Sequence, residues 1–304
     1  MPIKNQMTRR RRSVTALFAL VVAVTASATP AGATFPGRNG KLVVQRFDYP
    51  RDNLYLIDPD GSDAARVSHG VGSDIAASFS ADGRSIVFYR SREQGAGLYL
   101  VNADGTQQRR VPNTGPGYVP PSFAPDGRTV AFGNQGIFTI RIDGTHQRVV
   151  DGDPFSRRPV YSADGRSIAF TRRTSGTATE RPYLVRADRT VRRLANAGSA
   201  LSFSPDSRRL LLAREGDIYV LVLKGHRLRR LTNGKFDDTD AVFSPNGRQI
   251  AFVRHESAET GDSSQVGVYV MRADGTQKHR ILAESTAALD WQPLGGDQLW
   301  RPFG

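Results

Sequence analysis

The sequence predicts an all-β protein, a six-bladed β-propeller of four-stranded blades that is closed by a C-terminal strand pairing with the first blade. Three observations favour this fold: a repeat of 38 to 44 residues, glycine-containing turns between short apolar runs, and one spare strand near the C-terminal end. A repeat of that length matches one propeller blade.

Five segments carry the repeat: SFSADGRSIVF from Ser78, SFAPDGRTVAF from Ser122, VYSADGRSIAF from Val160, SFSPDSRRLLL from Ser202 and VFSPNGRQIAF from Val242. Their turn positions are spaced by 44, 38, 42 and 40 residues and are Gly83, Gly127, Gly165, Ser207 and Gly247. A sixth, degenerate copy has its turn at Gly40. Six copies predict six blades.

Each repeat supplies four short strands. Asp-Gly or Asn-Gly between two apolar runs favours a hairpin, because glycine adopts positive φ without a Cβ clash. The next run, such as Ile86-Val87-Phe88, is apolar on both faces and predicts a strand buried between neighbouring blades. A third strand follows, as in LYLVNADGT from Leu98, and a short basic fourth strand, as in Arg109-Arg110-Val111, ends the unit.

The two ends of the chain complete the ring. The first unit has its turn at Asn39-Gly40 but no preceding strand, whereas Ala288–Pro293 is a spare strand that aligns with the first strand of the other repeats. If this strand pairs into the first blade, no sheet edge is left open at the seam. We therefore expect a propeller over residues 34–294 and a tail over 295–304.

Residues 1–33 are typical of a secretory signal peptide. Lys4 and Arg9–Arg12 form a basic region, an apolar stretch runs from Val14 to about Ala28, and Ala31-Gly32-Ala33 has the small-x-small form of a cleavage site. A leader retained as a membrane anchor and the export route are left open. The chain has 42 basic and 29 acidic residues; without the five basic residues of the leader the net charge falls from +13 to 37 − 29 = +8. We expect a secreted, periplasmic or cell-envelope protein.

The repeat motif, followed by a YVM-x-ADGT strand and an RR-L strand, resembles the propeller repeat of the TolB family over residues 35 to 294. The resemblance implies a six-bladed propeller in an exported protein, used as a protein-binding platform. It covers the propeller part alone, since the leader runs almost directly into the first blade and leaves no room for the α/β domain of TolB.

The sequence shows no set of residues typical of a catalytic site. The chain has no cysteine and no Gly-x-Ser-x-Gly motif, and three of its five histidines fall in or just after exposed turns. The stretch DPDGSD from Asp58 resembles a calcium loop superficially, but Asp-Gly turns recur there in other blades. We therefore expect no enzyme activity and no cofactor, with a cation in the central channel left open.

Binding residues are expected where the first strand of each blade enters the central channel. These positions vary between blades while the framework does not, as in a site grafted onto a repeat. The predicted partner-binding residues are Asp74, Tyr118, Arg158, Asp238 and Asp240.

The predicted partner is a protein or peptide of the envelope, bound by a monomer, with an acidic envelope polymer as a further electrostatic partner. Nucleic acid is not expected, because the arginine pairs lie on the outermost strands, where charge prevents edge pairing, and are spread around the rim. The alternative function is a carbohydrate-active envelope enzyme, a polysaccharide lyase or hydrolase, using the cluster Asp237–Asp240 with Arg157 and Arg158.

Overall fold

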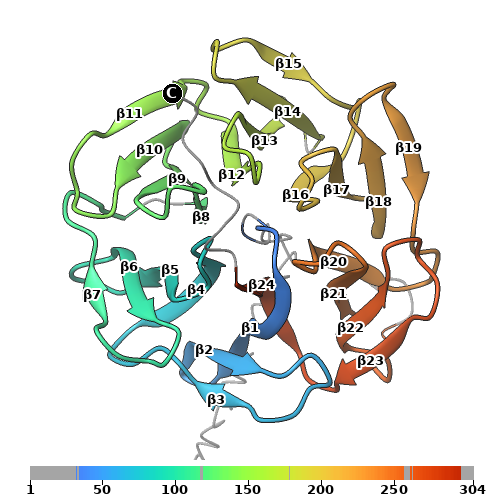
Figure 1. Ribbon diagram of the computed structural model, residues 1–304, viewed down its shortest axis with the longest axis horizontal. Helices are drawn as coiled ribbons and strands as arrows, with labels where there is room; N and C mark the ends of the chain where they lie inside the picture. Colours follow the sequence, from blue (N-terminus) through green and yellow to red (C-terminus); the bar gives the residue numbers. More distant parts are fainter. Residues whose placement is uncertain are drawn as a thin grey trace, which may run out of the picture.

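The structure is a computed structural model that describes residues 32, 34–116, 119–177, 179–256, 261 and 263–295. Six four-stranded antiparallel sheets are arranged as blades around a central axis (Figure 1). The described residues contain no helix, and so none that could cross a membrane. The fold predicted from the repeat is confirmed.

The strands run outward from the axis in chain order, except in the first blade. Blade 1 comprises β24 (Thr286–Leu294), β1 (Arg38–Asp48), β2 (Arg51–Ile57) and β3 (Ala65–Arg66). Blade 2 comprises β4 (Ser73–Phe79), β5 (Ser85–Ser91), β6 (Gly97–Asn102) and β7 (Arg109–Arg110). Blade 3 comprises β8 (Val119–Phe123), β9 (Thr129–Gly133), β10 (Ile137–Arg141) and β11 (Arg148–Asp151).

The other half of the ring repeats this order. Blade 4 comprises β12 (Ser156–Tyr161), β13 (Ser167–Arg173), β14 (Glu180–Arg186) and β15 (Val191–Arg193). Blade 5 comprises β16 (Ser199–Phe203), β17 (Arg209–Arg214), β18 (Asp217–Val222) and β19 (Arg227–Arg230). Blade 6 comprises β20 (Asp237–Phe243), β21 (Gln249–His255), β22 (Gly267–Arg272) and β23 (His279–Leu282).

The C-terminal strand β24 closes the ring as predicted. It pairs antiparallel with β1, from Arg38 opposite Leu294 to Arg46 opposite Thr286. The Trp291 side chain is fully buried, and its indole N–H donates a 3.0 Å hydrogen bond to the Gly40 carbonyl. Blade 1 is thus assembled from both ends of the propeller, which removes the open edges a broken ring would expose.

The hydrophobic core lies between the blades. One buried cluster joins blades 1 and 2, another joins blades 5 and 6, and a third joins blades 6 and 1. Second-strand residues such as Val87 and Phe88 are buried on both faces of their sheet. Ala131, Ala169 and Ala251 are fully buried at the centre of this strand, where a small side chain lets neighbouring sheets approach. The blades therefore bury their apolar faces against one another.

The start of the described chain occupies the channel. Figure 1 shows the segment before β1 near the centre of the ring. Thr34 hydrogen-bonds Ser202 Oγ at 2.8 Å and the Phe243 carbonyl at 3.3 Å, so it contacts blades 5 and 6. The Phe35 side chain is buried in the cluster that spans blades 2, 3 and 4. Apart from Gly32, the predicted leader lies outside the described residues, and its cleavage stays a prediction.

Replacing Trp291 by alanine should test the closure. Removing this buried indole leaves a cavity at the seam, and the change should cost about 3–5 kcal/mol of unfolding free energy. Leu228→Ala is the control, because this side chain is 37% exposed on β19 and its loss should cost less than about 0.5 kcal/mol. Urea denaturation measures both; equal midpoints for the two variants would contradict a closing role for β24.

Candidate functional site

The innermost strands β4, β8, β12, β16, β20 and β24 line the channel, and the face of the ring at which they begin is called the mouth face here. All six show a β-bulge or irregularity against the second strand of their blade, seen as register shifts at Ile75/Ser78, Val119/Ser122, Arg157/Val160, Ala200/Ser202, Thr239/Val242 and, for β24 against β1, Val44/Gln45. A bulge bends its strand and re-aims a side chain. The bulges sit next to the positions predicted to bind a partner.

Asp74 is buried and engaged within its own blade. Its two carboxylate oxygens accept hydrogen bonds from Arg90 Nε at 2.5 Å and Arg90 Nη2 at 2.7 Å. The Arg90 guanidinium lies over the Tyr99 ring, 4.7 Å from its centroid. Asp74 thus fixes an arginine that is stacked on the third strand.

Asp238 makes the same arrangement in blade 6. Arg254 donates to its carboxylate from Nε at 2.7 Å and from Nη2 at 2.9 Å, and stacks 4.7 Å from the Tyr269 centroid. Burial raises the pKa of Asp238, and the paired Arg254 opposes that rise. A bidentate pair of this kind holds both side chains in one geometry.

This clamp of acid, arginine and tyrosine belongs to the repeat and was missed in the sequence. An arginine lies among the last three residues of the second strand in five blades and is placed over a third-strand tyrosine each time, at Arg46, Arg90, Arg172, Arg214 and Arg254. The signal was present as a recurring Arg and a recurring Tyr. The acidic residue that pairs with the arginine comes from different elements, such as Asp151 for Arg172 and Glu284 for Arg46. It therefore does not lie at a constant sequence distance from the arginine.

Arg158 and Asp240 occupy the bulges of β12 and β20. Both have left-handed backbones, with φ of 57° and 50°, which non-glycine residues adopt only when the surroundings enforce it. Both side chains are buried, and the negative charge of Asp240 acts to raise the pKa of Arg158 although blade 5 lies between them in the chain. The structure therefore brings these two predicted residues close enough for their charges to interact.

Glu180 connects Arg158 to the neighbouring polar groups. Its carboxylate pairs with Arg157 and with Arg158 Nη1, the latter at 3.4 Å, and accepts a hydrogen bond from Ser199. Burial alone would raise the pKa of Glu180, but the arginines and Ser199 together hold it below its ordinary value. Burial lowers the pKa of Arg158, against the opposing effect of Glu180.

The fifth predicted residue, Tyr118, lies outside the described residues.

Comparison with known protein families identifies the family to which the chain belongs. A family model described as the TolB beta propeller domain matches residues 14–196 and 143–296. The chain belongs to the TolB β-propeller family. The similarity predicted from the repeat motif is confirmed.

Solved structures agree with this assignment. TolB from Acinetobacter baumannii is 18% identical with a TM-score of 0.70, over 84% of this chain and 67% of that one. Putative TolB from Agrobacterium tumefaciens is 20% identical with a TM-score of 0.63, over 80% and 88%. An oligogalacturonate lyase from Vibrio parahaemolyticus is 11% identical with a TM-score of 0.54, over 83% and 78%. At these identities the likeness shows the fold alone.

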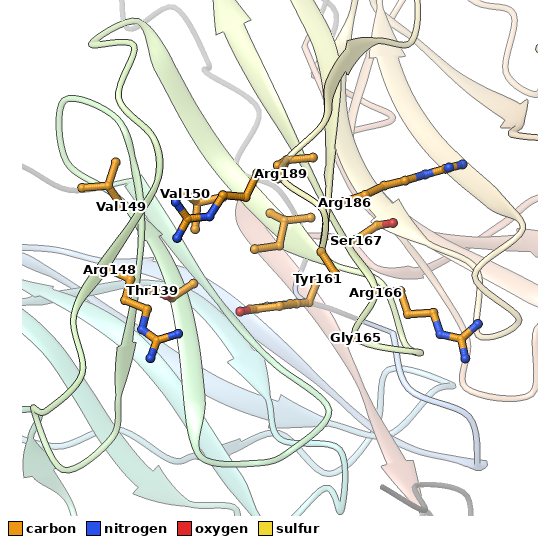
Figure 2. A pocket seen from close by; sticks show the side chains of 13 residues that line it. Thr139, Arg148, Val149, Val150, Tyr161, Gly165, Arg166, Ser167, Arg186 and Arg189 are labelled. Atoms are coloured by element: carbon orange, nitrogen blue, oxygen red, sulfur yellow. The ribbon is translucent and has the colours of Figure 1, made fainter. Parts of the chain in front are cut away.

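The opposite face of this TolB-family propeller, the turn face, carries the Asp-Gly turns and arginine-lined grooves between blades. The groove between blades 3 and 4 has a volume of about 270 Å³, and no acidic side chain lines it. Arg148 and Arg189 extend from the two sides of this groove, and Arg166 and Arg186 lie on its blade 4 side (Figure 2). Related grooves lie between blades 2 and 3 and between blades 5 and 6.

Metal-binding groups are not gathered in the described part of the chain, where no three His, Asp or Glu side chains are placed to hold an ion. In the DPDGSD stretch, Asp60 accepts hydrogen bonds from the Ser62 amide at 2.9 Å and the Ser62 hydroxyl at 2.7 Å. Equivalent hydrogen bonds recur in other blades, where the hydroxyl of a threonine two residues further on donates to the carboxylates of Asp104, Asp143 and Asp274. These aspartates shape turns.

Acid titration should report on the Glu180 cluster. Because its folded pKa is lowered, ionised Glu180 contributes stability above its unfolded pKa of about 4.3, and this contribution is lost as pH falls through the folded value. Glu180→Gln should therefore be less stable than the wild type at pH 7, and the difference should shrink toward pH 3. Urea midpoints measure this, with Glu215→Gln as the control for an exposed pair. A constant difference across this pH range would contradict the cluster.

Proposed function

We propose that this protein is an exported, non-catalytic scaffold of the cell envelope that binds a protein or peptide partner on the mouth face of its propeller. One observation carries the proposal: exposed apolar side chains gather on that face. Phe47 is 52% exposed, Tyr49 100% and Val71 57%. Exposed aromatic and aliphatic groups next to one another are typical of protein-binding surfaces.

The name patch is used here for these three side chains, which lie on neighbouring segments of blades 1 and 2. Phe47 is the next-to-last residue of β1 and Tyr49 lies in the hairpin to β2, while Val71 lies in the loop that leads into β4. The Asp52 amide donates a 3.2 Å hydrogen bond to Ser73 Oγ, which ties the hairpin to the start of β4. The patch is therefore held on two connected segments rather than on one free loop.

The charge beneath the patch suggests the chemistry of the partner. Burial raises the pKa of Asp52, and the nearby carboxylates of Asp48 and Asp74 act in the same direction. Desolvation is the main cause of this shift, and the two carboxylates add a smaller electrostatic contribution of negative sign. An apolar peptide segment that carries a lysine or arginine complements this surface.

The predicted residues take two roles in this proposal. Asp74 and Asp238 hold Arg90 and Arg254 and so shape the mouth face from below. Arg158 and Asp240, at the bulges, set the charge at the centre of the channel. Tyr118 stays a proposed contact residue.

Affinity capture from envelope extract tests the patch. The double variant Phe47→Ala with Tyr49→Ala should reduce capture of the partner by about tenfold or more, because central aromatic side chains dominate such interfaces. The matched control is Val149→Ala with Leu228→Ala, which removes two exposed apolar side chains from the outermost strands. Melting curves confirm that both variants fold. Equal loss in the two, or no loss in the first, would contradict the proposal.

An acidic envelope polymer is a second proposed partner, for the turn face. The arginines of the blade 3–4 groove favour it, since Arg148 and Arg189 lie across a groove that no acidic side chain lines. Binding of polygalacturonate that weakens with added salt supports this partner. Turnover of that polymer by the purified protein would instead favour the carbohydrate-active alternative.

A further inference from the structure

One level of the channel is lined by six repeat-equivalent residues. Each pairs with the central residue of the second strand of its own blade, as Asp290 does with Val43 and Ser78 with Val87. All six are fully buried: Ser78, Ser122, Val160, Ser202, Val242 and Asp290. The position takes a hydroxyl or an apolar side chain in five blades and a carboxylate only in blade 1.

The hydroxyls at this level connect one blade to the next. Ser122 Oγ accepts from the Tyr161 amide at 3.0 Å, and Ser78 Oγ accepts from the Phe123 amide at 3.4 Å. Asp290 Oδ2 makes the same contact with the Phe79 amide at 2.7 Å. Because serine suffices for this bond elsewhere, the carboxylate is not needed for it.

The Asp290 carboxylate is buried without a cation. Its other contacts are the Trp291 amide at 2.8 Å and the Ser78 hydroxyl, and no salt bridge between described residues includes it. No charged group of the strands packed around β24, which are β1, β4, β20 and β21, acts on it. Burial raises the pKa of Asp290 to about 8. An uncompensated buried carboxylate is costly, and a neighbouring cation offsets part of that cost.

The neighbour of this carboxylate is the end of the predicted leader. A Cβ built on Gly32 would lie 2.3 Å from Asp290 Oδ2 and 2.2 Å from Ser78 Oγ, so only glycine fits there. Two residues on, Thr34 is anchored by Ser202 and Phe243. Chain geometry places the Thr34 nitrogen within about 10 Å of the Asp290 carboxylate.

We propose that cleavage between Ala33 and Thr34 creates an α-ammonium group that turns toward the space left by Gly32 and forms an ion pair with Asp290 while the Thr34 side chain stays anchored, so that the channel is a binding site for the processed N-terminus. The inference rests on the export included in the proposed function. Cleavage adds water across the peptide bond: the Ala33 carbonyl gains the hydroxyl and leaves as a carboxylate, and the Thr34 nitrogen gains the protons. The new cation appears beside the uncompensated buried carboxylate.

The pair would make the folded ring sensitive to processing. Thr34 already bonds blades 5 and 6, and Asp290 bonds blade 1 to the Phe79 amide of blade 2. The ammonium–carboxylate contact connects these two sides of the channel through the chain end. A chain that keeps its leader lacks the contact and is the less stable form.

A thermodynamic cycle tests the pair. The wild type and Asp290→Asn are each prepared as a chain that begins at Thr34, released from a cleavable fusion, and as a chain that keeps residues 28–33. At pH 6.5 Asp290→Asn should lower the melting temperature of the Thr34 chain and should leave the longer chain unchanged or more stable. Glu215→Gln is the control and should change neither. An equal effect of Asp290→Asn in both chains would overturn the proposal.

Reactivity of the N-terminus gives a second measurement that does not depend on unfolding. Acetylation of the Thr34 amine by an activated ester at pH 7, followed by mass spectrometry, should be at least about tenfold slower in the wild type than in Asp290→Asn or Asp290→Ser. Equal rates would overturn the pair even if the variants differ in stability.

The outcome is separable from the proposed function. Asp290 lies inside the channel, so Asp290→Asn should leave partner capture by the mouth face unchanged. Failure of capture with an intact pair counts against the mouth face alone. The intact mass of the exported protein tests the cleavage itself: a chain that begins at Thr34 supports the proposal, and a chain that retains residues 1–33 overturns it.

Discussion

Closure of the ring is the constraint on which the rest of the structure depends. The buried clusters lie between blades, so a blade with a missing neighbour leaves an apolar sheet face in water. The seam is therefore the critical point, and the first and last strands of the propeller, β1 and β24, pair there. Trp291 fills its interior, and Asp290 bonds the first blade to the second.

The closed ring separates framework from variation. Framework contacts recur at equal positions: the glycine turns, the interblade apolar residues and the arginine stacked on a tyrosine. Departures from the repeat concentrate at the bulges and in the loops of the mouth face, where Arg158 and Asp240 replace the alanine found at Ala76. Since the framework holds without these side chains, they are free to differ between blades, as recognition requires.

The fold was predictable because propeller contacts are repetitive and local. Each turn, such as that at Gly83, is specified within one hairpin, and the closing strand could be found because Asp290-Trp291-Gln292-Pro293 aligns with the first strand of other blades.

The site was less predictable. Asp74 and Asp238 were selected as variable mouth residues, but their arginine partners are sixteen residues further along the chain, on the paired strand. The charge of Asp240 acts on Arg158 from two blades further along the chain, and only the closed ring brings these side chains near one another. The patch at Tyr49 and the approach of Gly32 to Asp290 each occur once and do not recur with the repeat, so the repeat could not predict them.

Hydrogen exchange of the processed protein measures closure most directly. If closure by β24 stabilises the whole ring, amides of β24 and β1 exchange only through global unfolding, with the same free energy of opening as the innermost strands β12 and β16. Exchange of β24 at a clearly lower free energy, while the other innermost strands stay protected, would show that the ring is stable without its seam and would contradict stabilisation of the ring by β24.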